Sequence, residues 1–120
     1  MCQLNQIKHG AVFMMDIPQN SNIKNMQAGV RPVVAISNNM NLKSSPCIHI
    51  VPLTTKMTKH KLPTHVVLHA DFLSRKSICL AEQLMQVSKD TLIETGRYLG
   101  SLSEEDLSNV KNALKIQLAL

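Results

Sequence analysis

The sequence predicts a small, mostly antiparallel β-fold, either a barrel or a sandwich, followed by one C-terminal helix. Three observations support this fold class. The 120 residues suffice for a single domain with a modest core. The first two thirds of the chain alternate short apolar segments with polar turns, which is typical of small antiparallel folds. The end of the chain changes to a helical spacing of apolar residues.

Five segments have the composition of short strands. They are apolar and bounded by Gly, Pro, Asn or Ser, which end regular structure. The predicted strands cover residues 11–17, 32–37, 47–53, 65–69 and 77–87. In the third strand, Ile48 and Ile50 alternate with Cys47, His49 and Val51, so the two sets should point to opposite faces of the sheet.

Polar segments separate these strands. Residues 18–29 are rich in Asn and form a predicted loop that is long enough to carry function. Residues 38–46 predict a dense turn, because Asn, Ser and Pro favour local backbone bends. Residues 54–61 predict a basic loop.

The last segment predicts an amphipathic helix. Ser101 or Ser103 can cap its first turn, and the acidic residues 104–106 follow where the helix dipole favours negative charge. Capping therefore explains these carboxylates better than a catalytic pair does. The apolar residues at helical spacing are Leu107, Val110, Leu114 and Leu118. We expect this helix to pack on the β-fold or on a second subunit.

The positive charge is unevenly distributed. Residues 1–61 carry a net charge of +6, whereas residues 62–120 carry −1. A basic half favours a polyanionic partner such as a nucleic acid, although composition alone fits a solvated basic surface equally well. Aromatic residues make up only 2% of the chain, which argues against base-stacking platforms and aromatic peptide grooves.

Composition gives no reason to expect a cofactor or a membrane segment. Cys2, Cys47 and Cys79 form no CxxC pair, which disfavours a disulfide framework or zinc site and fits a reducing compartment. No set of His, Cys, Asp and Glu has metal-site spacing, and Asp16 is the only acidic residue before position 71. No apolar run approaches the ~20 residues of a membrane helix. A cytoplasmic protein is expected.

An arginine and a threonine lie on two predicted strands that follow each other along the sequence. Arg31 begins the segment RPVVAISNN, and Thr54 lies at the end of VPLT. If these strands pair, the guanidinium and the hydroxyl can meet at one phosphate, and the planar fork of arginine matches phosphate oxygens. Taken alone, each residue has a simpler explanation, as a surface arginine and as a good strand residue.

The ordered set of segments resembles the MazF/PemK ribonuclease toxins. Besides the two strands above, it includes LPTHV at 62–66 and SICLAEQ at 77–83, and it extends over nearly the whole chain from about Gly10. The resemblance implies one domain over residues 1–120, with an SH3-like antiparallel barrel and a C-terminal helix. It also implies the toxin of a type II toxin–antitoxin system. Such a toxin is a metal-independent, sequence-specific endoribonuclease (an mRNA interferase) that cleaves single-stranded RNA and leaves 2′,3′-cyclic phosphate and 5′-hydroxyl ends.

The resemblance further implies a homodimer, and an antitoxin whose acidic, disordered tail competes with RNA. Its catalytic positions fall on Arg31, for charge stabilisation and leaving-group assistance, and on Thr54, as its partner. The RNA-binding positions are Asn25, Gln27, Asn38, Lys56, Leu62, His65, Ser77 and Gln83. His65 is expected to contact RNA first and to carry a proton second. Asn38 and Ser77 could instead cap local backbone.

One departure from the family pattern affects catalysis. The GSEQ-like run before the arginine reads Lys24-Asn25-Met26-Gln27, so Met26 replaces the glutamate. If that glutamate acts as a base, another group must replace it here. Glu82 interrupts an apolar strand, so we expect it to bond internally, either to a backbone amide or to a basic side chain. Two rival functions remain: a related-fold toxin that poisons a protein such as DNA gyrase, and a catalytically weakened RNA-binding relative.

Overall fold

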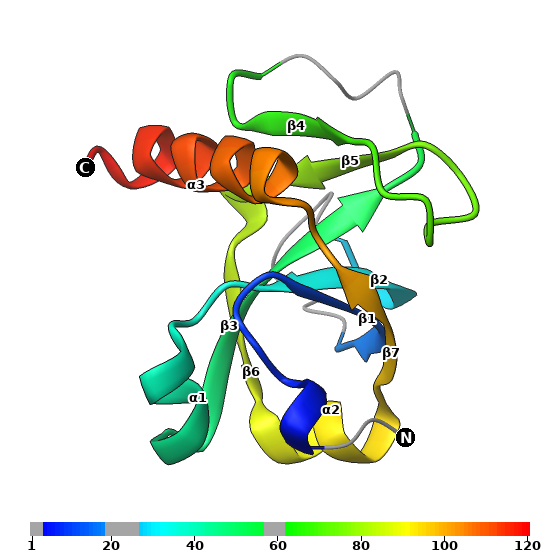
Figure 1. Cartoon of the computed structure of the whole chain (residues 1–120), viewed down its shortest axis with the longest axis vertical. Coiled ribbons are helices and arrows are strands. Elements are labelled where there is room, and N and C mark those ends of the chain that lie inside the picture. Colours follow the sequence, from blue (N-terminus) through cyan, green and yellow to red (C-terminus); the bar gives the residue numbers. More distant parts are fainter. Residues whose placement is uncertain (1–3, 19–26, 57–61) are drawn as a thin grey trace.

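A curled antiparallel sheet forms the body of the protein. The computed structural model describes residues 4–18, 27–56 and 62–120. Within these ranges the sheet has seven strands in the order β4-β5-β3-β2-β1-β7, with β6 also paired to β3. The strands are β1 (Ala11–Ile17), β2 (Gly29–Ala35), β3 (Cys47–Thr54), β4 (His65–Leu68), β5 (Ser77–Leu80), β6 (Met85–Ser88) and β7 (Arg97–Ser101). Every pairing is antiparallel, and the sheet curls into a half-barrel (Figure 1).

The strand β3 makes the sheet curl, because its two ends have different partners. Its first half pairs with β6 from Cys47 to Ile50, whereas its last residues, Leu53 and Thr54, pair with β5. The single strand predicted over 77–87 is therefore wrong. The 3-10 turn η3 (Ala81–Gln83) divides it, so that β5 and β6 can follow different parts of β3.

Alternation along the strands creates two apolar clusters. Phe13 and Ile50 belong to the cluster that packs on helix α2 (Lys89–Thr95), together with the buried Leu92 of that helix. Val12 and Val51 belong to the second cluster, on the side of helix α3. Adjacent residues of β1 and β3 thus point into different clusters, as the period of a strand requires.

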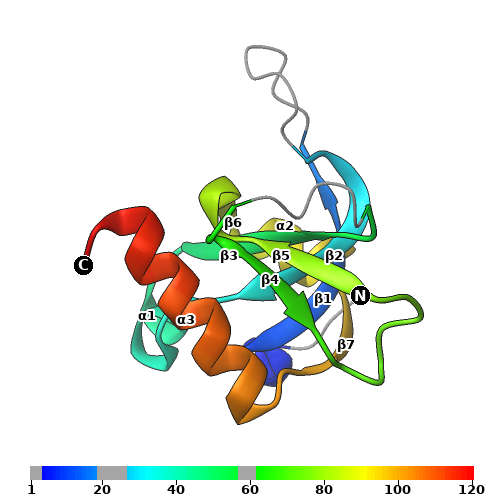
Figure 2. The same cartoon turned by 90° about the horizontal axis from the view of Figure 1, so that it is seen from above.

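The C-terminal helix α3 (Glu104–Leu118) confirms the helix prediction. Its cap is Ser103, whose hydroxyl accepts a hydrogen bond from the backbone N of Asp106 at 3.1 Å. The buried Asp106 carboxylate also accepts a bond from the backbone N of His69 at 2.9 Å, which ties the helix to the end of β4. The helix lies alongside β4 and packs against η3 (Figure 2). None of the described helices is both long and apolar enough to span a membrane.

Besides the 3-10 turns η1 (Leu4–Gln6) and η3, two α-helices and one strand were not predicted from the sequence. The expected turn over 38–46 contains a short helix, α1 (Asn39–Ser44), and the chain after β6 forms α2 and β7. Ser88 caps α2, and Gly96 ends it, since the Gly96 backbone N bonds to the carbonyl of Leu92 at 2.8 Å. The second strand also begins earlier than predicted, at Gly29, whose φ of +83° suits only glycine at low cost.

Candidate functional site

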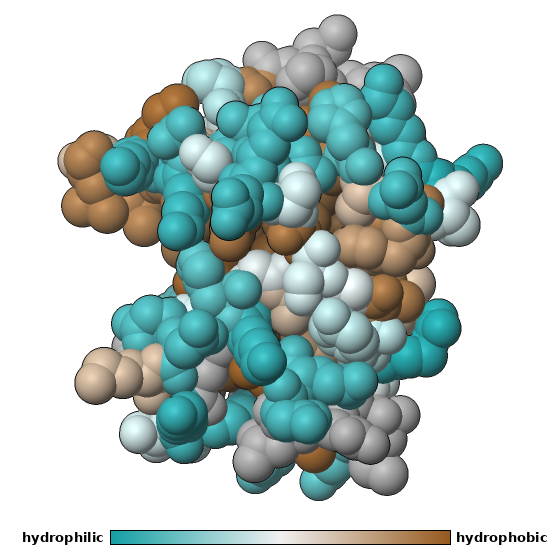
Figure 3. Space-filling view, viewed as in Figure 1, coloured by the Kyte–Doolittle hydropathy of each residue, from teal (hydrophilic) through white to brown (hydrophobic). Residues whose placement is uncertain are grey.

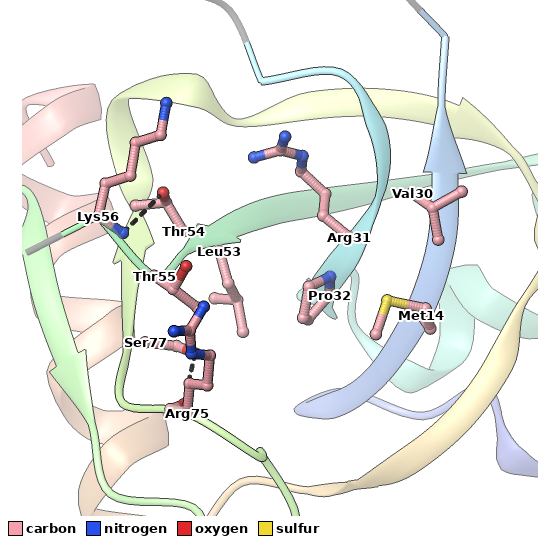
Figure 4. A pocket seen from close by; sticks show the side chains of 10 residues that line it. All are labelled: Met14, Val30, Arg31, Pro32, Leu53, Thr54, Thr55, Lys56, Arg75 and Ser77. Atoms are coloured by element: carbon pink, nitrogen blue, oxygen red, sulfur yellow. Dashed lines mark hydrogen bonds between the residues drawn. The ribbon is translucent and has the colours of Figure 1, made fainter.

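The strand register places Arg31 beside Thr54. Val33 pairs with Pro52 and Val34 with Val51, so the same register continued toward the start of β2 sets residue 31 opposite residue 54. Both residues line one open cavity of about 280 Å³. Thr55, Lys56, Arg75 and Ser77 supply its other polar groups, and Met14, Val30, Pro32 and Leu53 its apolar ones (Figure 4). The convergence expected from the sequence is therefore present.

Two neutral oxygens hold the Arg31 guanidinium. Its Nε donates to the carbonyl oxygen of Ala28 at 2.9 Å, and its Nη1 donates to the side-chain oxygen of Gln27. Gln27 is only 6% exposed, and its backbone N donates to Gln83 Oε1 at 2.8 Å. In the described part of the chain no carboxylate pairs with Arg31. The guanidinium is thus oriented while its positive charge stays available to a ligand.

The Thr54 hydroxyl lies at the same end of the cavity as Arg31. Its Oγ1 accepts a hydrogen bond from the backbone N of Lys56 at 3.2 Å. That bond uses an acceptor site of the hydroxyl and leaves its proton free to be donated. The Lys56 side chain is exposed, and its ammonium group extends along this side of the cavity (Figure 4). This side of the cavity therefore carries a guanidinium, a hydroxyl and an ammonium group, which suit the oxygens of a phosphate.

A second polar cluster surrounds Glu82, on the 3-10 turn η3. Glu82 Oε2 lies 2.8 Å from His65 Nε2, and Thr64 Oγ1 donates to Glu82 Oε1 at 3.0 Å. The backbone of the same turn is fixed as well, since the N of Ala81 donates to the carbonyl of Thr64 at 3.1 Å. The expected internal partner of Glu82 is therefore a basic side chain, His65, together with a hydroxyl.

Comparison with known proteins identifies the family. The model of the "PemK-like, MazF-like toxin of type II toxin-antitoxin system" family matches residues 8–118. An "Endoribonuclease MazF" of Staphylococcus saprophyticus is 33% identical over 116 residues, covering 95% of this chain and 92% of that protein. The chain belongs to the MazF/PemK toxin family.

Solved structures agree with this fold. A mycobacterial "Endoribonuclease in complex with its cognate antitoxin" has 24% sequence identity and a TM-score of 0.75, covering 94% of this chain and 95% of that chain. The MazF of Deinococcus radiodurans has 19% identity and a TM-score of 0.76, covering 94% and 96%. The predicted antiparallel fold of the MazF/PemK type with a C-terminal helix is thereby confirmed.

The family pattern does not gather all of its expected RNA-binding residues around this cavity. Lys56 and Ser77 line it. Asn38 lies beyond the far end of β2, and Leu62, 47% exposed, precedes β4, so neither lines the cavity. Asn25 lies outside the described residues, as does the Met26 departure.

Four of the expected RNA-binding residues use their side chains or backbone in bonds within the protein. Gln27 holds Arg31, and Gln83 accepts from the Gln27 backbone. The His65 side chain is only 6% exposed and bonds to Glu82. The hydroxyl of buried Ser77 donates to the backbone carbonyl of Arg75 at 3.0 Å, which is the local capping role that the sequence left open.

Arg75 is the member of the cavity that sequence reasoning missed. It is exposed, and it precedes β5, whose residue Ile78 pairs with Thr54. Once β5 is placed beside the end of β3, residues just before it must border the same cavity. In the sequence, Arg75 stands two positions before SICLAEQ. Its place in the cavity could be inferred only once β3 was known to pair with β5.

Cys79 does not line the Arg31 cavity. Cys79 is fully buried, and burial together with the nearby Glu82 charge raises the pKa of its thiol far above the usual range. Cys79 therefore behaves as a small buried hydrophobic residue. In the described residues, no group of three or more His, Cys, Asp and Glu side chains could hold a metal ion.

Proposed function

We propose that this protein is a type II toxin that cleaves single-stranded RNA, as a sequence-selective endoribonuclease that needs no metal ion. Membership of the MazF/PemK family and the 33% identical relative named Endoribonuclease MazF support this function. The observation that carries it is the position of Arg31, whose oriented, unneutralised guanidinium shares one cavity with the Thr54 hydroxyl.

The proposed reaction is a transfer within the RNA. The ribose 2′-oxygen loses its proton and forms a bond to the adjacent phosphorus, while the bond from phosphorus to the 5′-oxygen breaks and that oxygen takes up a proton. Arg31 would stabilise the charge that grows on the phosphoryl oxygens, and Thr54 would donate to one of them. The products would be a 2′,3′-cyclic phosphate and a 5′-hydroxyl.

Residues of the site would take part in this reaction in two ways, by contacting RNA directly or by positioning Arg31. Lys56 and Leu62 are exposed and available to contact RNA directly. Gln27 and Gln83 would serve it by fixing Arg31, and His65 by fixing the turn that carries Gln83. Asn38, at the other end of β2, would reach only RNA that extends well past the cavity.

We also propose a homodimer that an antitoxin neutralises, in the cytoplasm where mRNA is translated. The family is one of toxin–antitoxin systems, and the mycobacterial relative was solved with its cognate antitoxin. Ile116 and Leu118 in the last turn of α3, and Leu120 just after it, are exposed by 55%, 50% and 87%, and Figure 3 shows this apolar end of the molecule. A second subunit would cover such a patch, and an acidic antitoxin tail would fit the basic cavity.

Cleavage of a long RNA tests the proposal and its rivals together. Purified protein should cut the RNA at a short recurring sequence in excess EDTA, and the 5′ ends should accept phosphate from polynucleotide kinase without prior phosphatase treatment. RNA binding without cutting would identify the weakened relative. Neither binding nor cutting, with inhibition of a protein target such as DNA gyrase, would favour the other rival. Loss of cutting in EDTA that a divalent ion restores would overturn the metal-independent mechanism.

A further inference from the structure

A second cavity continues from the first along the surface. It measures about 390 Å³ and shares Met14, Pro32, Thr55, Arg75 and Ser77 with the Arg31 cavity. Beyond these it is lined by Phe72, Leu73, Ser74, Arg97 and Leu99. The two cavities therefore form one trough, which begins at Arg31 and Thr54 and ends at Arg97.

Three strands build the floor of this trough. Pro32 of β2 pairs with Met14 of β1, and Met14 pairs with Arg97 of β7, so the three residues form a row across the sheet. The wall comes from the segment between β4 and β5, which contributes Phe72 and Arg75. The register thus fixes the order of groups along the trough, with Arg31 at one end and Arg97 at the other.

The Phe72 ring is held in place at the far end. A Cβ atom added to Gly100 would lie 2.5 Å from Phe72 Cδ2, so the ring rests directly on the backbone of β7. Leu99 and Met14 line the same cavity. This end therefore offers an apolar surface beside a cation, which suits the face of a nucleobase or a ribose next to its phosphate.

The positive charge of the trough is the feature that best indicates its ligand. The sequence contains ten lysines but only three arginines, and all three arginines, Arg31, Arg75 and Arg97, line the trough. Arg75 and Arg97 are exposed, and no carboxylate in the described residues pairs with either. No Asp or Glu lines either cavity. Guanidinium groups at both ends and in the middle match the repeated phosphates of a nucleic-acid strand.

We propose that Arg75 and Arg97 form a second phosphate subsite, which binds the RNA strand on one side of the scissile phosphate. This inference rests on the proposed function, because it assigns the flanking part of the same substrate. A strand seated at Arg31 must leave the first cavity, and the trough toward Arg97 offers it a continuous basic path. An acidic peptide is the competing occupant, and the experiment separates it from RNA.

Arg97→Ala is the decisive variant, because Arg97 lines only the second cavity. Its substrates are an RNA oligonucleotide with one cleavage site and two shortened forms, each cut back to the scissile linkage on one side. On the full oligonucleotide we expect KM to rise about tenfold with kcat unchanged, the usual effect of losing one charge-assisted contact remote from the reacting atoms. On the form that lacks the flank bound by Arg97, variant and wild type should be equal.

Salt dependence and controls complete the test. Binding of the oligonucleotide with a 2′-deoxy group at the cleavage site should lose about 0.7 from its log–log salt slope in Arg97→Ala and again in Arg75→Ala. Lys76→Ala is the matched control, since Lys76 is exposed beside Arg75 but lines neither cavity. Equal melting temperatures of all variants exclude misfolding.

The outcomes distinguish this proposal from the proposed function. If wild type cuts no RNA, the proposed function fails, yet binding of the 2′-deoxy oligonucleotide still tests the subsite. Unchanged RNA binding in Arg75→Ala and Arg97→Ala overturns the subsite. A loss of kcat on both shortened forms also overturns it. If these variants weaken only the binding of a Glu- and Leu-rich peptide and leave RNA binding intact, the trough is a peptide site and the proposal is wrong.

Discussion

The three-residue turn η3 positions two basic side chains, Arg31 and His65, through different kinds of partner. Gln83 of η3 bonds to the backbone of Gln27, which in turn holds Arg31 through a neutral amide oxygen. Glu82 of η3 bonds to His65 through a carboxylate. The first arrangement orients a cation without cancelling its charge. In the second arrangement the basic group and the carboxylate bond to each other.

The contrast explains which of the two can act on a phosphate. A basic side chain that already pairs with a carboxylate attracts a phosphate less strongly, because the carboxylate cancels much of its charge. The effect is large where water is scarce, since Coulomb interactions between close charges are strong there. Arg31 meets this condition within the described residues and lines an open cavity. The His65 side chain is only 6% exposed and faces Glu82. We therefore propose that the Arg31 side of the turn serves catalysis and that the Glu82 side contributes to stability.

The largest expected effect is that of Arg31→Ala. Removing a preorganised group that stabilises transition-state charge should lower kcat about 10²–10³-fold. The melting temperature should change little, because the bonds of Arg31 to Gln27 and Ala28 lie at a partly exposed site. Thr54→Ala should act in the same direction more weakly. Cleavage kinetics and calorimetry on the same preparations measure both quantities. Unfolding of either variant would show that the residue is structural.

Glu82→Ala should have the reverse profile. It leaves the Thr64 hydroxyl and the largely buried His65 ring without their partner, which costs about 1–3 kcal/mol of stability. Denaturant unfolding should show the loss in its midpoint with an unchanged slope. Glu82→Gln is the matched control, because it retains an acceptor and should lose less. If Glu82→Ala keeps full stability and loses cleavage as completely as Arg31→Ala, the division between the two sides of η3 is wrong.

Gln27→Glu tests the contrast directly, because it keeps the size of the side chain and gives the oxygen that holds Arg31 a negative charge. The new carboxylate would compete with the phosphate for the guanidinium, so cleavage should fall by about tenfold, a loss equivalent to one charged contact. Gln27→Met, which removes the bond without adding charge, should fall less. RNA affinity in 50 mM and 200 mM salt provides the readout, since neutralising one cation also flattens the salt dependence. Equal loss in the two variants would mean that orientation, and not charge, is what Gln27 supplies.

Local sequence patterns predicted the parts of the fold that depend on local chemistry. The strand at 11–17 and the helix capped by Ser103 follow from alternation, spacing and capping, and both are present. Residues 77–87 could not be divided by the same means. Glu82 interrupts their apolar pattern, but no Gly or Pro marks a break there. The break at η3 depends on which part of β3 each half joins. The position of Arg31 and Thr54 in one cavity was predictable because consecutive antiparallel strands usually pair, as β2 and β3 do here.

The rest of the site depends on contacts between distant residues. Gln27 and Gln83 are 56 positions apart, and no spacing in the sequence predicts the hydrogen bond between them. Arg75 and Arg97 belong to the half of the chain with net negative charge, so a count by halves directs attention away from them. Their common position follows from the β5 and β7 pairings, which only the folded sheet provides.

The smallest effect at neutral pH concerns Cys79, the third ionisable group near η3, which stays uncharged. Burial raises the pKa of its thiol above the ordinary value of 9.0, and the Glu82 charge adds to this. The folded state therefore keeps a proton that the unfolded chain releases, so this contribution to stability is complete below pH 9.0 and declines as pH rises above it. The decline should be at most about 1.4 kcal/mol per pH unit. Unfolding free energies of wild type and Cys79→Ala between pH 7 and 10.5 isolate it, since the variant should lack this part of the slope whatever stability it loses to the cavity. Parallel curves for the two proteins above pH 9 would show that the thiol ionises in the folded state, and that the region around Glu82 is more open to water than its packing indicates.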